Sequence, residues 1–256
     1  MSLEMFSAVF SVIAVIGSPI AFAVFQKKGN HSKFGFWNVI AGIVSTFLFK
    51  YVLFGFLSSW AVRLLGLDVS SAVTACLVSV ICTAAMIMLA LAVAEFIYCG
   101  RHMDKDQAVG FALGATITDI MNSFLMAALS NLVYLEQTSA GTFYTNLLET
   151  LTEEQALAVM DTYAAYTPAV FIYPGVITLA FLAGNYLSAV LFAGRTERHS
   201  FSYVFLAVLC TATYSAIFYW MAPDTIANAD LFLVITALLL FMTAQFIYKH
   251  YTVHHG

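Results

Sequence analysis

A single carboxylate, Asp119, interrupts an apolar stretch that is long enough to cross a membrane as a helix. A charged carboxylate near the centre of a bilayer costs at least about 2.5–3.5 kcal/mol, so such residues have a partner, a water-filled cavity or a function. Asp119 could act as a general acid or base, bind a cation, carry a proton or bond to a neighbouring helix. The other polar residues within apolar stretches bear on the choice between these roles.

Four such residues are candidates for contact with Asp119 or for a shared function. Asn122 lies three residues further on and shares its helix face, and Asn185, in the middle of another apolar stretch, is the expected neighbour across helices. Glu95 lies close to the end of its stretch, where it either pairs at the helix end or lines a cavity open to the cytoplasm. Lys50 either extends towards the outer surface or pairs with an acid, and the first is expected because Asp119 lies ~8 Å deeper by helical rise.

The histidines argue against several kinds of intramembrane chemistry. An intramembrane zinc protease, a haem held between helices and a Ser–His dyad all need histidine within a span. An aspartyl protease needs two carboxylates that share a proton, and Glu95 is ~7 Å shallower than Asp119 on another helix. We therefore predict no metal and no cofactor, since all six histidines fall outside the predicted spans: His31, His102, His199, His250, His254 and His255.

Composition identifies the elements that position these residues. Apolar residues make up 62% of the chain and charged residues 9%, whereas ordinary soluble domains have about 25% charged residues. Apolar runs near 20 residues recur, and the short alternating segments of a membrane barrel are lacking. We predict an all-α polytopic transmembrane bundle with seven spans: Leu3–Phe25, Phe34–Ser59, Ser70–Tyr98, Ala108–Tyr134, Pro168–Ala193, Phe201–Met221 and Leu231–Lys249.

The basic residues predict the orientation of these spans. Loops on the cytoplasmic side carry an excess of Lys and Arg, and here alternate loops carry nearly all of them. The opposite loops contain Arg63 and most of the acids. We predict an outer N-terminus and a cytoplasmic C-terminus in a multi-pass bacterial cytoplasmic membrane protein, because one side holds Lys27, Lys28, Lys33, Arg101, Lys105, Arg195, Arg198 and Lys249.

Residues 1–256 are expected to form a single integral membrane domain without a separate soluble module. Its long outer loop, 135–167, contains apolar residues among acids, and Thr152-Glu-Glu-Gln155 is typical of a helix start. We expect one or two short amphipathic helices that cover the bundle or gate a substrate. Gly110 and Gly114 form a GxxxG pair that permits close helix approach, which favours a central position for the fourth span.

Glu95 and Arg101 lie at a helix end, and Asp106-Gln-Ala-Val-Gly-Phe-Ala-Leu-Gly114 begins the helix that follows. Further on, Asn185 precedes Ser188, and the loop Arg195-Thr-Glu-Arg198 comes next. The stretch Ala94–Asn131 resembles the YhfC-type branch of the glutamic intramembrane protease superfamily, which includes CAAX-protease-like members, and the later residues fit the layout of that branch. The resemblance implies a shared helical fold.

At the catalytic positions of that branch, this chain has different residues. Ala115 stands where the branch has His, Asp119 where it has Glu, Asn185 near a further His, and Cys210 about where another His is expected. An activated water needs a general base and oriented partners. Proteolysis is therefore not expected to follow from the resemblance.

Three functions are compatible with the sequence. The first is a protein that resembles intramembrane proteases without proteolysis and binds a hydrophobic peptide or lipid, or scaffolds a membrane partner, through Asp119, Asn122, Asn185 and Arg101. The second is a small transporter, or a membrane subunit of one, that uses Asp119 for an ion or proton. The third is an active hydrolase with Glu95 and Asp119 as its catalytic pair. The bilayer is the expected environment, and no basic patch indicates nucleic acid.

Overall fold

The computed structural model describes residues 2–66, 72–96, 103–194, 200–220 and 229–254, and within these ranges the chain is helical with no strand. Six helical runs in this described part of the chain are long and apolar enough to cross a membrane, which confirms an all-α polytopic membrane protein. The elements are α1 (Leu3–Gly29), α2 (Phe36–Thr46), η1 (Phe47–Leu53), α3 (Phe54–Leu65), α4 (Ala72–Ala94), α5 (Lys105–Asp119), η3 (Ile120–Phe124), α6 (Leu125–Ala140), α7 (Phe143–Leu148), α8 (Glu153–Ala164), α9 (Pro168–Ala193), α10 (Ser200–Trp220) and α11 (Ala229–His254).

Each of the seven predicted spans overlaps a helix or a continuous helical run. Ser70, Tyr98 and Met221, at the ends of the third and sixth predicted spans, lie outside the described residues. The sixth predicted span corresponds to α10. Its apolar segment Phe201–Thr213 is shorter than the six runs that can cross a membrane. The second and fourth runs are longer than predicted, at Phe36–Leu64 and Lys105–Ala140. Both contain polar residues near their ends that a hydropathy argument places in loops.

Two short π-helical segments interrupt these longer runs, and the sequence predicted neither. η1 joins α2 to α3, and η3 joins α5 to α6. A π turn closes hydrogen bonds from residue i to i+5, so the direction of later side chains changes relative to an uninterrupted α-helix. Such turns occur frequently at functional sites, and here η3 begins directly after Asp119.

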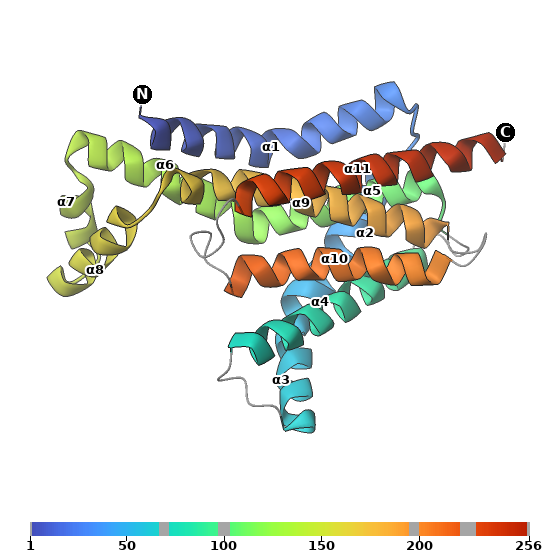
Figure 1. Ribbon diagram of the computed structural model, residues 1–256, viewed down its shortest axis with the longest axis horizontal. Helices are drawn as coiled ribbons and strands as arrows, with labels where there is room; N and C mark the ends of the chain where they lie inside the picture. Colours follow the sequence, from blue (N-terminus) through green and yellow to red (C-terminus); the bar gives the residue numbers. More distant parts are fainter. Residues whose placement is uncertain (1, 67–71, 97–102, 195–199, 221–228, 255–256) are drawn as a thin grey trace.

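Helix α9 forms the centre of the bundle (Figure 1). It packs against α1, α5, α10 and α11. In its most apolar stretch of 18 residues, 89% of the residues are buried, compared with 28% in α1 and 22% in α11. Helix α5 is also largely buried, as expected for the first half of the fourth span. The side chains of α9 and α5 therefore face other helices, while those of the outer helices are available to lipid.

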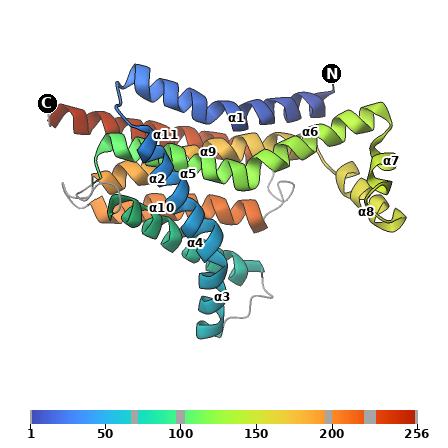
Figure 2. The same ribbon diagram turned by 180° about the vertical axis from the view of Figure 1, so that it is seen from behind.

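The run α2–η1–α3 crosses the other helices steeply, as Figure 2 shows. Its first part packs against α5 and α4, whereas α3 contacts α4 and then projects beyond the rest of the bundle (Figures 1 and 2). Helix α3 ends at Gly66, which has the left-handed conformation common at helix ends. Large apolar side chains on α3 are consequently exposed, with Phe56 at 74%, Trp60 at 61% and Leu64 at 66%.

Glycines allow α2 and α5 to approach backbone to backbone. A Cβ atom on Gly114 would overlap the carbonyl oxygen of Val39 and lie 3.0 Å from the Cα of Gly42. A Cβ atom on Gly110 would collide with the side chain of Asn38. The close helix approach predicted from the GxxxG pair is confirmed, and α2 is the partner helix.

The segment 135–167 contains the end of α6 and the short helices α7 and α8. The capping box expected at Thr152 and Gln155 is present, with each side chain bonded to the other residue's backbone amide. Burial, together with the neighbouring Tyr166 and Tyr134, raises the pKa of Tyr163. An aromatic cluster fixes these helices to the ends of α6 and α9, and it consists of Tyr134, Phe143, Tyr163, Tyr166 and Phe171.

Replacing Gly114 with alanine is expected to destabilise the protein, because the added methyl group forces α2 away from α5. Overpacking a tight contact costs about 1–3 kcal/mol. The midpoint of thermal unfolding in detergent, followed by circular dichroism, measures the effect. Gly17→Ala is the matched control, since a Cβ there meets no atom within 4 Å. Equal midpoints for the two variants would contradict the close contact.

Candidate functional site

A buried ion pair joins the second and fourth helical runs. The ammonium of Lys50, on η1, lies 2.6 Å from Oδ1 of Asp119 at the end of α5. The hydroxyl of Tyr51 donates to the same oxygen at 2.8 Å. The side chains of Lys50 and Asp119 are 8% and 1% exposed, so the pair is almost fully shielded from its surroundings.

The second carboxylate oxygen of Asp119 is also bonded. The amide nitrogen of Asn185, on α9, donates to Oδ2 at 3.1 Å and to the hydroxyl of Thr116 at 3.2 Å. The Thr116 hydroxyl in turn donates to the carbonyl of Ala112 within α5. The prediction that Asn185 is the neighbour of Asp119 is confirmed, and three donors from two other helical runs hold one carboxylate.

An aromatic ring completes the surroundings of the ammonium. Nζ of Lys50 lies 4.4 Å from the centre of the Phe181 ring, on α9, one turn before Asn185. A cation over a ring face gains about 0.5–2 kcal/mol, more when it is desolvated. Helix α9 therefore supplies a partner for each charge: Asn185 for the carboxylate and Phe181 for the ammonium.

The expectation that Lys50 extends towards the outer surface was wrong. It took the ~8 Å difference in depth from helical rise, as if both spans crossed the membrane at the same inclination. The run α2–η1–α3 is steeply inclined relative to α5 (Figure 2), so equal helical rise does not give equal depth. The sequence does contain a signal for the pairing of Lys50 with Asp119, because opposite charges within spans usually pair with each other.

Asn122 does not join this site. Its amide donates to the carbonyl of Thr118 on its own helix at 2.8 Å, and the residue is exposed. The expectation of a face shared with Asp119 assumed α-helical geometry, but η3 begins at Ile120 and changes the direction of the residues that follow.

Glu95 and Asp119 form their contacts at opposite ends of α5. Glu95 accepts a hydrogen bond from the backbone amide of Met103 at 2.7 Å, just before α5 begins. Asp119 lies at the other end of α5, ~22 Å further along by helical rise. The structure therefore does not bring the two candidate catalytic carboxylates together, and Arg101 lies outside the described residues.

A cavity of about 10 Å³ adjoins the ion pair. It reaches Lys50 and Asn185, and Ala115 forms part of its wall. A cavity needs about 10–15 Å³ to hold one water molecule, so this space accommodates at most a single water. Within the described ranges, no group of three His, Cys, Asp or Glu side chains is arranged to hold a metal ion.

A second polar cluster holds the opposite end of α5, and the sequence did not predict it. Oδ1 of Asp106 accepts hydrogen bonds from the hydroxyls of Ser32 at 2.7 Å and of Tyr248 at 3.0 Å. These contacts connect α5 to the loop before α2 and to α11. The acidic residue in the first turn of a helix was a visible signal, but its partners are far apart in sequence.

Comparison with models of known protein families, with curated proteins and with solved structures finds no match to this chain.

Removing either charge of the ion pair is expected to lower stability more than removing both. Lys50→Met or Asp119→Asn alone should cost about 3–5 kcal/mol, because the remaining charge is buried without its partner. The double variant should lose less than the sum of the single losses. Unfolding of the four proteins by denaturing detergent, followed by circular dichroism, gives the coupling energy.

Lys28→Met provides the matched control for this cycle, because Lys28 is exposed at the end of α1. A surface change of this kind is expected to alter stability by less than about 0.5 kcal/mol. Strictly additive losses for Lys50→Met and Asp119→Asn would refute the pairing.

Proposed function

We propose that this chain is a non-proteolytic relative of the YhfC-type branch of intramembrane proteases, and that it binds a hydrophobic peptide or lipid or scaffolds a membrane partner. The observation that carries the proposal is the bonding of both Asp119 oxygens to Lys50, Tyr51 and Asn185. A carboxylate that is neutralised and bonded in this way lacks a free oxygen to activate water. The adjoining space of about 10 Å³ is too small for a peptide bond.

The clustering of the substituted positions supports a relationship to the protease branch. Ala115 and Asn185, which stand at or near positions of family histidines, line one cavity. Asp119, which stands at the position of a family glutamate, is bonded to Asn185. Three positions that are far apart in sequence thus meet at one place, as the parts of an ancestral catalytic centre would.

An active hydrolase is less well supported by the same contacts. It requires Glu95 and Asp119 to share one water, whereas Glu95 is bonded just before α5 begins and Asp119 lies at the far end of that helix, which is ~22 Å long. The imidazole partners that would orient such a water are replaced by Ala115 and Asn185.

Transport of a proton or ion is the second candidate, and the two π-helical segments favour it. Lys50 lies within η1, and η3 begins directly after Asp119, so both charges lie in or beside π-helical turns, which occur frequently at functional sites. A transport cycle would have to separate Asp119 from Lys50 to free its carboxylate. In either case we propose that the basic loops face the cytoplasm of a bacterial cell.

The test is reconstitution of wild type and Asp119→Asn in liposomes that contain a labelled single-span peptide and a pH-sensitive dye. Under the proposal, both proteins show only background cleavage and background proton flux. Peptide fragments are measured by mass spectrometry and flux by dye fluorescence. Glu95→Gln is included, because a hydrolase would lose activity in both variants.

Cleavage by wild type that Asp119→Asn abolishes would establish the hydrolase, and flux that it abolishes would establish transport. Circular dichroism checks that each variant retains its helices. Tyr51→Phe repeats the comparison with a smaller disturbance, since it removes one donor and leaves the ion pair in place.

A further inference from the structure

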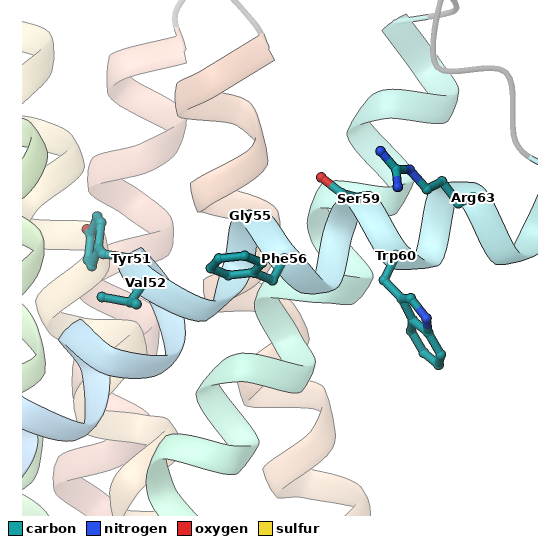
Figure 3. A pocket seen from close by; sticks show the side chains of 7 residues that line it. All are labelled: Tyr51, Val52, Gly55, Phe56, Ser59, Trp60 and Arg63. Atoms are coloured by element: carbon teal, nitrogen blue, oxygen red, sulfur yellow. The ribbon is translucent and has the colours of Figure 1, made fainter.

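An open groove of about 560 Å³ follows η1 and α3 from Tyr51 to Arg63 (Figure 3). This volume falls within the 300–1,000 Å³ typical of small-molecule and cofactor sites. Among the described residues, none lines both this groove and the small cavity beside Asn185. Its lining consists of Tyr51, Val52, Gly55, Phe56, Ser59, Trp60 and Arg63.

The chemistry of the groove changes along its length. Its inner end is Tyr51, whose hydroxyl is held by Asp119. Its middle is apolar, with Val52 and Phe56, and Gly55 leaves space because a Cβ there would meet no atom within 4 Å. Its outer end carries Trp60 and the guanidinium of Arg63. The groove is therefore amphipathic, with one cationic end.

Arg63 gives the groove a preference for a negatively charged head group. The residue is exposed, and among the residues that the structure describes no acid pairs with it. Guanidinium binds phosphate through two parallel hydrogen bonds, which makes arginine well suited to such groups. Tryptophan is enriched where the hydrocarbon of a bilayer meets the head groups, which suits Trp60 beside Arg63. Figure 3 shows that the two side chains leave α3 in different directions.

The length of the groove suits an acyl chain. Tyr51 and Arg63 are separated by twelve residues, or ~18 Å of helical rise. Because this run is inclined to the other helices (Figure 2), the length is measured along the helix and is not a depth within one leaflet. An acyl chain that begins at a phosphate on Arg63 can lie along Phe56 and Val52 and end near Tyr51.

We infer that this groove binds an anionic phospholipid, with its phosphate on Arg63 and one acyl chain along Phe56 and Val52. The inference deepens the proposed function, on which it rests, by naming the class of ligand and the site. It concerns Arg63 and the exposed face of α3, none of which the sequence singled out as a binding site.

The experiment uses tryptophan fluorescence in vesicles. Trp37→Phe and Trp220→Phe leave Trp60 as the only tryptophan of the full chain. The protein is reconstituted in phosphatidylcholine with increasing fractions of either phosphatidylglycerol or phosphatidylcholine that carries brominated chains, which quench nearby tryptophan. Phosphatidylglycerol is expected to quench Trp60 with about fivefold higher relative affinity, the factor that one Lys or Arg contributes near an anionic surface.

Arg63→Gln in this background should reduce the ratio between the two lipids to about one. Lys28→Gln is the matched control, because it removes one exposed positive charge at the end of α1, and it should leave the ratio unchanged. Equal quenching in the parent protein, or a preference that survives Arg63→Gln, would overturn the inference. Protection of Trp60 from both brominated lipids would also overturn it, since a protein segment would then cover the groove.

Failure here is distinguishable from failure of the proposed function. Proteolysis or flux that depends on Asp119 would remove the proposed function and leave the lipid ratio at Trp60 intact. Loss of the lipid preference would remove this site, while the absence of cleavage and flux would stand. Circular dichroism of Arg63→Gln confirms that its helices are retained.

Discussion

The contact between Lys50 and Asp119 constrains the packing of the whole bundle. A carboxylate and an ammonium are stable in a shielded interior only when they pair closely and their remaining bonding capacity is met. Meeting this requirement brings η1, the end of α5 and the middle of α9 together, because Tyr51 and Asn185 must also reach the carboxylate. The glycine contact between α2 and α5 makes that approach possible. The steep crossing of α2–η1–α3 and the central position of α9 are consistent with the same requirement.

Much of the helical fold could be predicted from the sequence for a physical reason. Backbone groups in lipid must bond within their own segment, so an apolar run near 20 residues has little choice other than a helix. The run Pro168–Ala193 has the same bounds in sequence and structure for this reason. The end of α3 could not be predicted, because Ser58, Ser59 and Arg63 lower the hydropathy without breaking the helix.

The candidate site was only partly predictable. Asn185 could be assigned to Asp119 because a polar amide within a span needs a partner inside the bundle. The depth of Lys50 does not follow from residue counts, because these ignore the inclination of a helix. Asn122 was misplaced because a π-helical turn has no known signature in this stretch and changes which residues share a face. The long-range partners of Asp106 depend on tertiary packing, which apolar periodicity does not specify.

The ion pair determines how the helices pack more than it contributes to the stability of the bundle. Replacing a buried pair with apolar residues of similar volume is often neutral or stabilising, whereas breaking one is costly. A bundle with leucine-like residues at positions 50 and 119 could slide or rotate its helices with little penalty. With Lys50 and Asp119 present, an arrangement that separates them leaves a buried charge unpaired. The pair thus favours the packing in which α3 projects from the bundle, and with it the groove that ends at Tyr51.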